Sequence, residues 1–371
     1  MLIGVPTEIK NHEYRVGMVP ASVRELTQRG HQVLVQTGAG LGIGFADSEY
    51  QAAGADIASD AASVFATSDM IVKVKEPQAV ERAMLREGQI LFTYLHLAPD
   101  PEQTTDLVDS KAVCIAYETV TDNTGGLPLL APMSEVAGRM SIQAGAQALE
   151  RSRKGRGMLL GGVPGVEPAK VVIIGGGMVG ANAAQMAIGT GANVVILDRS
   201  IPVLRRLNAQ FGNAITTVYS TTEAIEKHVL DADLVIGGVL IPGAAAPKLV
   251  TAEHIRDMKN GAAIVDVAID QGGCIETSVA TTHDEPTYVV DGVVHYCVAN
   301  MPGAVPLTST FALNNATLPY IIELADKGYK RALTENSHLM NGLNVINGQI
   351  TCESVATALN YPFVPAKQAL S

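Results

Sequence analysis

Short apolar runs alternate with amphipathic stretches along the first third of the chain. The runs have the length of buried strands, and the stretches between them carry apolar residues at helical spacing. This rhythm is typical of a parallel sheet with helices packed on it. The predicted strands are Leu2–Val5, Gln32–Gln36, Met70–Val74, Ile90–Leu95 and Ala112–Ala116, and the predicted helices include Ala21–Arg29, Gln78–Arg86 and Pro101–Ser110.

A second alternating series begins at Lys170, where "KVVIIGGGMVG" predicts a buried strand and a glycine turn. Near its end, "TYVVDGVVHY" predicts a hairpin, because its central Asp291-Gly292 suits a type I′ turn. The expected fold class is therefore α/β, with two Rossmann-like, doubly wound parallel-sheet domains. The other strands predicted in this series are Asn193–Asp198, Asp233–Gly238 and Ala262–Val267.

Composition agrees with two well-buried globular domains. The chain has 371 residues, of which 47% are hydrophobic and 17% charged, which excludes a disordered chain. A net charge of −11 disfavours nucleic acid and anionic membranes as partners. No apolar stretch reaches the length of a membrane span, and the start of the chain lacks the pattern of a signal peptide.

The cysteines point to a reducing compartment, and we expect the protein in the cytoplasm. They are scattered and form no Cys-x-x-Cys pair, so we interpret them as small buried apolar residues and not as a disulfide framework or a zinc site. Because metal-ligating residues are not clustered either, we expect no required metal. The four are Cys114, Cys274, Cys297 and Cys352.

The glycine turn has the pattern of a dinucleotide-binding loop. Gly175, Gly177 and Gly180 follow an apolar strand and open an alanine-rich helix, which is the context that the pattern requires. Such glycines let the backbone approach a pyrophosphate, and the helix N-terminus offers free N–H groups to it. Asp198 ends the next strand and can accept hydrogen bonds from the adenosine ribose. It would repel a 2′-phosphate and so favours NAD over NADP, although arginines follow it closely; the alternative is a glycine turn without a ligand.

Four ionisable residues follow strands of the first series. Arg15 lies in the loop after the first strand, and Lys75 ends the third. His96 follows the fourth strand and Glu118 the fifth. Because the carboxyl ends of parallel strands meet at one edge of a sheet, we expect all four side chains there.

Each of these residues also has a purely structural interpretation. Arg15 could be a solvated loop charge, and a lone histidine is more often a hydrogen-bonded structural residue than a catalyst. Lys73 and Lys75 alternate with valines, which also fits an edge strand with one wet face. Glu118 could cap or pair. The shared edge makes a functional site the better hypothesis.

The four residue types suggest a dehydrogenase for a small carboxylate with a 2-amino or 2-hydroxy group. Arginine and lysine can hold a carboxylate, and a histidine can move a proton during oxidation of an amine or an alcohol. A nicotinamide would accept the hydride. Asp266 lies within a predicted strand of the second series and is expected to be structural. Asp270, after that strand, is expected at the cleft between the domains, where it could activate water against an imine. That role would favour an amino acid as substrate.

Two long helical stretches, Met133–Arg153 and about Leu307–Lys327, are predicted to join the domains. Ser134 is a possible N-cap of the first. We expect a discontinuous substrate domain of residues 1–132 and 306–371. Residues 133–305 would form the NAD-binding Rossmann domain and include the linking helix. The tail of the chain would then return to pack on the substrate domain.

Long motifs in a fixed order resemble the L-alanine dehydrogenase family, which is related to the NAD-binding subunit of proton-translocating transhydrogenase. They extend over nearly the whole chain and include "EIKNHEYRVG", "VKVKEPQ", "YLHLA", "LLAPMSEVAGRMS", "VIIGGGMVGANAAQMAIG", "DVAIDQGGC" and "DGVVHYCVANMPGAVP". The resemblance implies NAD-dependent interconversion of L-alanine with pyruvate and ammonium. It also implies a homohexamer.

The resemblance further implies roles for particular residues. Arg15 and Lys75 would bind the substrate, His96 would be the catalytic acid and base, and Asp270 would assist water and proton handling. Tyr94, Met133 and Asn300 would line the substrate pocket. Cofactor contacts would come from the glycine turn and from Ser134, Met178, Val179, Asp198, Ser220, Val239, Leu240, Val267, Ala268, Ile269, Asp270, Val298, Ala299, Asn300 and Met301.

Two positions depart from the family pattern. Val203 and Val279 stand where many members carry a basic residue, which affects the expected affinity for NAD and not the chemistry. Three other functions stay open at this point. They are a transhydrogenase-like NAD(H)-binding subunit, a dehydrogenase of the lysine pathway and an NAD-sensing protein.

Overall fold

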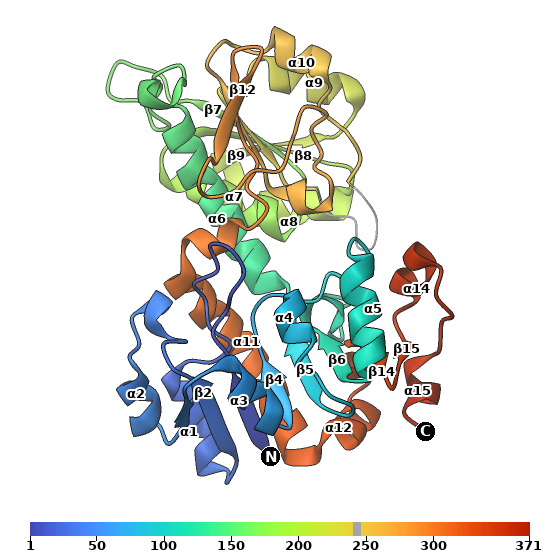
Figure 1. Cartoon of the computed structure of the whole chain (residues 1–371). Helices are drawn as coiled ribbons and strands as arrows, with labels where there is room; N and C mark the ends of the chain where they lie inside the picture. Colours follow the sequence, from blue (N-terminus) through green and yellow to red (C-terminus); the bar gives the residue numbers. More distant parts are fainter. Residues whose placement is uncertain (240–245) are drawn as a thin grey trace. The chain divides into compact units, whose positions relative to one another are not determined.

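The computed structural model describes residues 1–239 and 246–371, and the chain divides into two compact units (Figure 1). The first unit comprises Met1–Met133 together with Val305–Ser371, and the second comprises Ser134–Ala304. Both are α/β units built on a largely parallel sheet, so the predicted fold class is confirmed.

The first unit contains, within the described residues, an eight-stranded sheet of order β15-β14-β6-β5-β4-β1-β2-β3. The strands from β6 to β3 are parallel, whereas β14 is antiparallel to β6 and β15 is antiparallel to β14. In Figure 1 the red strands from the end of the chain lie beside the teal β6. The strands are β1 Leu2–Val5, β2 Gln32–Gln36, β3 Asp56–Ala58, β4 Met70–Val72, β5 Ile90–Thr93, β6 Val113–Ala116, β14 Leu343–Ile346 and β15 Gln349–Ile350.

Helix α5 of the first unit begins at a recognisable signal. Asp100 accepts a hydrogen bond from the backbone N–H of Gln103 (3.0 Å) and Pro101 follows it, which together start α5. The helices are α1 Pro20–Gln28, α2 Asp47–Ala52, α3 Ala61–Thr67, α4 Ala79–Arg82, α5 Pro101–Ser110, α11 Pro306–Lys327, α12 Tyr329–Glu335, α13 Ser337–Met340, α14 Glu353–Leu359 and α15 Ala366–Ala369, with 3₁₀ turns η1 Leu41–Ile43 and η2 Tyr117–Thr119.

The second unit contains, as far as it is described, a seven-stranded sheet of order β12-β13-β11-β10-β7-β8-β9. Only the β12–β13 pair among these is antiparallel. Its turn has positive φ at both Asp291 (47°) and Gly292 (80°), which confirms the predicted type I′ hairpin. The strands are β7 Lys170–Ile174, β8 Asn193–Asp198, β9 Ile215–Tyr219, β10 Leu234–Gly237, β11 Ala263–Asp266, β12 Thr287–Val290 and β13 Val293–Tyr296.

Helix α6, Ala131–Ala148, begins in the first unit and continues into the second. It ends five residues before the predicted Arg153, which lies in a separate 3₁₀ turn, η3 Arg151–Arg153. The other helices of the second unit are α7 Met178–Gly189, α8 Ile201–Phe211, α9 Thr222–Leu230 and α10 Ala252–Asp257, with 3₁₀ turns η4 Gly212–Ala214, η5 Val267–Gln271 and η6 Met301–Ala304.

Each sheet has a point where the strand order reverses direction. In the first sheet it lies between β1 and β4, and in the second between β7 and β10. Loops that leave the carboxyl ends of such neighbouring strands diverge to opposite faces, and ligands bind in the space between them. These two points are therefore where functional side chains should be sought.

Candidate active site

Arg15 lies after β1, beside the reversal point of the first sheet, and is almost completely buried. Its Nε donates to Glu13 Oε1 (2.6 Å) and its Nη2 to Glu13 Oε2, while Nη1 lies 3.1 Å from the sulfur of Met133. Burial alone would lower the pKa of Arg15, but the hydrogen bonds and charge of Glu13 raise it. The guanidinium is thus a fixed cation whose Nε–Nη2 edge is occupied by Glu13.

Lys75 and His96 share a carboxylate neighbour, Glu76, on the other side of the reversal point. Glu76 Oε2 lies 3.4 Å from Lys75 Nζ and 3.8 Å from His96 Nδ1, and its Oε1 forms an ion pair with Lys10. Burial opposes ionisation of Glu76, but His96, Lys75 and Lys10 outweigh it and lower its pKa. The imidazole therefore faces a permanently charged carboxylate at neutral pH.

Lys73 lies beneath this cluster and is completely buried. Its Nζ lies 3.1 Å from Glu8 Oε2 and 2.6 Å from Glu81 Oε1. The alternative of an edge strand with one wet face is wrong, because β4 is a central strand and ends at Val72. The Lys73 ammonium group is stabilised by ion pairs and not by solvent.

His96 combines a partly exposed ring with an unusual backbone. Its φ is 51°, in the left-handed region that residues other than glycine rarely occupy, and 38% of its side chain is exposed. The ring of Tyr94 lies beside it, with centroids 5.8 Å apart. Tyr94 is buried and donates its hydroxyl to the carbonyl of Leu129 (2.5 Å), which fixes this neighbour.

A pocket of about 370 Å³ adjoins the Arg15 loop. It is formed within the first unit, by the loop after β1 and the turn after β2. Its polar lining includes Lys10, His12, Glu13 and Arg15, which suits a small charged molecule.

The glycine turn of the second unit follows β7 as predicted. A Cβ on Gly180 would lie 1.8 Å from the carbonyl oxygen of Gly175, and Gly175 itself has a φ of +99°. Gly177 is the N-cap of α7 and has no side chain that could cap the helix. A Cβ at this position would meet nothing within 4 Å. The first turn of α7 therefore offers backbone N–H groups beside open space, which fits a pyrophosphate.

Asp198, at the end of β8, already binds the backbone on both sides. Its Oδ2 accepts from Gly176 N (2.7 Å) and its Oδ1 from Ser200 N (2.7 Å). The carboxylate is thereby held next to the glycine turn, where it can still accept hydrogen bonds from ribose hydroxyls. Val203 packs here too, because its Cγ1 lies 2.8 Å from where a Cβ on Gly176 would be.

The other predicted cofactor residues of the second unit follow the carboxyl ends of its parallel strands. Ser220 follows β9, Val239 follows β10, and Val298, Ala299, Asn300 and Met301 follow β13. Ser134 lies instead in α6. Leu240 lies outside the described residues.

Asp270 lies in η5, which follows β11 and also contains Val267, Ala268 and Ile269. Asp266 holds this turn in place. Its buried carboxylate accepts hydrogen bonds from the backbone N–H groups of Ala268 (3.2 Å) and Ile275 (3.2 Å). Its predicted structural role is thus visible in its contacts.

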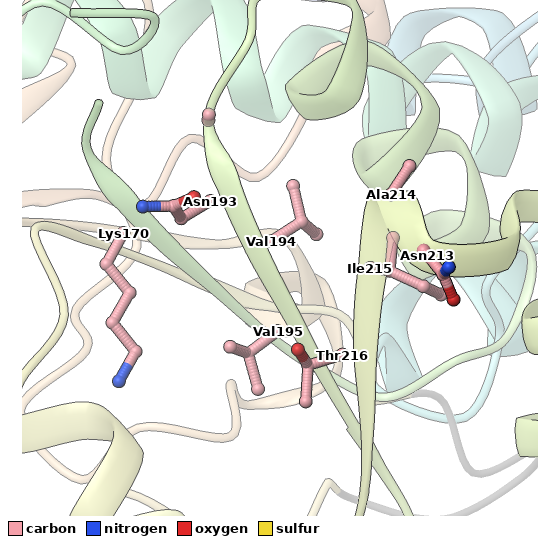
Figure 2. A pocket seen from close by; sticks show the side chains of 9 residues that line it. Lys170, Asn193, Val194, Val195, Asn213, Ala214, Ile215 and Thr216 are labelled. Atoms are coloured by element: carbon pink, nitrogen blue, oxygen red, sulfur yellow. The ribbon is translucent and has the colours of Figure 1, made fainter. Parts of the chain in front are cut away.

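The pocket in Figure 2, about 340 Å³, does not belong to either site. The labelled Lys170, Asn193 and Ile215 are the first residues of β7, β8 and β9. The pocket therefore lies at the amino ends of these strands, whereas the glycine turn follows the carboxyl end of β7. It also lacks ionisable side chains other than Lys170, whose Nζ is paired with Asp231 (2.8 Å).

Three residues of the first cluster were not singled out from the sequence. Glu13 pairs with Arg15, and Glu76 lies beside both Lys75 and His96. Lys10 in turn pairs with Glu76. The available signal was their position in the same loops, since Glu13 lies two residues before Arg15 and Glu76 follows Lys75. In the described ranges no group of three or more metal-ligating side chains could hold a metal ion, and no helix is long and apolar enough to cross a membrane.

Comparison with known proteins gives a consistent result over the whole chain. The family model described as alanine dehydrogenase/PNT, N-terminal domain, matches residues 4–137, and its C-terminal counterpart matches residues 141–353. The alanine dehydrogenase of Halomonas elongata is 59% identical over 366 residues, with 99% of each chain covered. That of Methanococcus maripaludis is 58% identical over 372 residues, covering 100% of each. A solved L-alanine dehydrogenase structure is 52% identical with a TM-score of 0.94, covering 97% of this chain and 99% of that one.

Proposed function

The chain belongs to the alanine dehydrogenase/PNT family, and we propose on this basis that it is an NAD-dependent amino-acid dehydrogenase. It catalyses the reversible oxidative deamination of L-alanine to pyruvate, ammonium and NADH. The observation that carries this proposal is the grouping of Arg15, Lys75 and His96 at the reversal point of one sheet, in a chain similar to alanine dehydrogenases over its full length.

Arg15 is proposed to bind the substrate carboxylate. Since Glu13 occupies its Nε–Nη2 edge, the contact would use the Nη1 side, next to Met133. Lys75 would hold the carbonyl oxygen of pyruvate or the second carboxylate oxygen of alanine, with Glu76 keeping its ammonium group in place. Tyr94 and Asn300 would line the same pocket.

His96 is proposed as the acid and base of the reaction. It would accept a proton from the substrate as the C–H bond at Cα breaks, and return one when the product forms. Asp270 would orient and deprotonate the water that attacks the imine carbon. NAD⁺, when bound, supplies the hydride acceptor.

NAD is proposed to bind at the glycine turn of the second unit. The uncapped first turn of α7 would bind the pyrophosphate, and Asp198 would accept from the ribose. The proposed contacts of this site are Ser134, Gly175, Gly177, Met178, Val179, Gly180, Asp198, Ser220, Val239, Leu240, Val267–Asp270 and Val298–Met301.

The alternative functions are less well supported. An NAD sensor or a transhydrogenase-like subunit needs no acid–base group, whereas here His96, Glu76 and Lys75 form a connected cluster. High identity to proteins named alanine dehydrogenase also disfavours them. A lysine-pathway enzyme would have to accommodate a larger substrate.

We also propose a homohexamer located in the cytoplasm. The four cysteines are free, which suits a reducing compartment. Light scattering after size-exclusion chromatography should give about 230 kDa, six times the 38.8 kDa chain. A mass of one or two chains would overturn the hexamer without affecting the proposed reaction.

NADH formation from NAD⁺ with a panel of L-amino acids tests the reaction. Alanine should give the fastest absorbance increase at neutral to alkaline pH. His96→Ala should lower kcat about 10²- to 10⁴-fold while leaving NADH affinity close to that of the wild type. A wild-type protein that binds NADH but turns over no amino acid would favour a sensor.

A further inference from the structure

The backbone of His96 requires an explanation beyond its proposed chemistry. A left-handed conformation at a residue with a Cβ is strained and persists only where the surroundings hold it. At His96 the φ of 51° turns the chain between β5 and the start of α5. The side chain therefore points where it does only as long as this turn is kept.

Glu118, in the 3₁₀ turn after β6, accepts hydrogen bonds from the backbone N–H groups of two consecutive residues, Leu95 and His96. Its Oε1 accepts from the N–H of His96 (2.6 Å) and of Leu95 (3.1 Å), and Oε2 lies 3.3 Å from the latter. A carboxylate is a stronger acceptor than a neutral group, so two converging N–H donors give a firm hold. None of these contacts involves the imidazole ring.

Helix α5 holds the same segment from the carbonyl side. The buried Gln103 donates its Nε2 to the carbonyl of Leu95 (2.6 Å), and the buried Thr104 donates its hydroxyl to the carbonyl of Leu97 (3.0 Å). The carbonyl groups on either side of His96 are thus fixed by side chains of α5 and not by Glu118. The N–H groups of Leu95 and His96 are held separately, by the carboxylate of Glu118.

We propose that Glu118 is a positioning residue for the reaction, and that its carboxylate holds the left-handed turn which aims the His96 imidazole at Glu76 and the substrate. The proposal rests on the proposed function of His96. The two carboxylates near His96 then have different roles. Glu76 faces the ring at Nδ1, and Glu118 fixes the backbone from which the ring projects.

Replacement of Glu118 should act on kcat and not on substrate or cofactor affinity. Glu118→Ala removes both acceptors and should lower kcat about 10- to 100-fold, the order expected when a reacting group is displaced by about 1 Å. The KM for alanine and the Kd for NADH should stay within about threefold of the wild type. Glu118→Gln keeps an acceptor oxygen and should retain most of kcat, whereas the shorter Glu118→Asp should lose as much as alanine.

A matched control removes a carboxylate with the same kind of contact elsewhere in the first unit. Asp69 Oδ2 accepts a hydrogen bond from the backbone N–H of Leu2 (2.8 Å), at the amino ends of the parallel strands of the same sheet. Asp69→Ala should leave kcat unchanged. An equal loss of kcat in both variants would mean that the effect is general destabilisation and would overturn the proposal.

A double-mutant cycle decides whether Glu118 acts through His96. In the His96→Ala background, Glu118→Ala should cause no further loss of kcat, because there is no imidazole left to aim. Loss by the same factor in both backgrounds would overturn the proposal. So would a Glu118→Ala or Glu118→Asp protein with kcat within twofold of the wild type.

Hydrogen exchange gives a readout that does not depend on turnover. The amides of Leu95 and His96 should exchange faster in Glu118→Gln than in the wild type, and faster still in Glu118→Asp, whereas Asp69→Ala should not change them. If the wild type turned over no alanine, the proposed function would fail while this measurement still tested the hold on the turn. Unchanged exchange rates in every Glu118 variant would show that Glu118 does not fix this part of the backbone.

Discussion

Lys73 is a buried charge whose stabilising partners are two glutamates. Burial alone would lower its pKa, but Glu8 and Glu81 raise it, so the ammonium stays charged in the folded protein. Such a buried charge has little net effect on folding stability only as long as all its partners are present. The whole triad therefore behaves as one unit.

Removing the cation from this triad should destabilise the first unit strongly. Lys73→Met leaves two buried carboxylates unpaired, and we expect a loss of about 3–5 kcal/mol in the free energy of unfolding. Urea unfolding followed by circular dichroism measures it. Arg331→Met, which breaks an exposed ion pair with Glu335, is the control and should change little. Equal effects of the two substitutions would contradict the prediction.

Acid should remove the stabilisation that Glu76 provides. Its folded-state pKa lies below its ordinary value of 4.5, so the contribution is complete above that pH and declines as the pH falls toward the folded-state pKa. Glu76→Gln should therefore be less stable than the wild type at pH 7, and the difference should narrow below about pH 4.5, by up to about 1.4 kcal/mol per pH unit. Thermal unfolding of both proteins between pH 7 and 3.5 would show it. A constant difference would rule out the assigned ionisation.

At this scale the sequence predicts which residues gather but not how they pair. Arg15, Lys75, His96 and Glu118 were expected at one edge because each follows a strand, and all four lie after the carboxyl ends of parallel strands. Their partners depend on rotamers and loop paths that no periodicity encodes. The hydrogen bonds that the Glu118 carboxylate accepts from the backbone N–H groups of Leu95 and His96 are the clearest case, since a glutamate after a strand gives no sign of its partner.

At the scale of elements, the turn between β7 and α7 depends on one close approach. Gly180→Ala would place a methyl group 1.8 Å from the carbonyl oxygen of Gly175, so the strand and helix must move apart. We expect a fall of at least tenfold in NADH affinity, because the N–H groups proposed to bind pyrophosphate shift with the helix. Fluorescence titration with NADH measures it.

The same helix offers its own control. A Cβ on Gly189, at the end of α7, would meet nothing within 4 Å. Gly189→Ala should keep NADH affinity and raise stability by about 0.5–1 kcal/mol through helix propensity. If both alanine variants lost affinity equally, the close approach at Gly180 would not be the cause.

Long or strongly apolar elements were predicted best. β1, β2 and β8 have the predicted bounds, because their apolar runs end at polar or turn residues. Other predicted strands, such as Met70–Val74, are longer than the strand observed, because β4 ends at Val72, next to the buried Lys73 and its glutamates. The three-residue β3 and the two-residue β15 are too short for a periodic signal and owe their conformation to the sheet edges they join.

At the scale of the whole molecule, the two units differ in how the chain builds them. The second is one continuous segment with its own core, which includes Val172, Val235 and Ile264. A protein of residues 131–304 should therefore fold alone and bind NADH. Circular dichroism and NADH titration test this, with the Gly180→Ala version as a weakly binding control. A disordered fragment would show that the second unit depends on the first.

The composite first unit was foreseeable only in outline. Two long helices and a returning tail are predicted from the sequence. In the structure β14 pairs with β6, with Leu343 opposite Ile115. That this pairing is antiparallel, and that β15 then forms the edge, depends on chain reversal by the short helices α12 and α13. Local patterns do not encode such long-range choices.

The pairing of β14 with β6 has a consequence for synthesis on the ribosome. All of Ser134–Ala304 is synthesised before α11 and β14, so the second unit can complete its sheet while the first still lacks its last two strands. Until then β6 presents an unpaired edge to other nascent chains. A stalled or prematurely terminated chain is thus expected to combine a finished second unit with an aggregation-prone, incomplete first unit, and to depend on chaperones while β6 is unpaired.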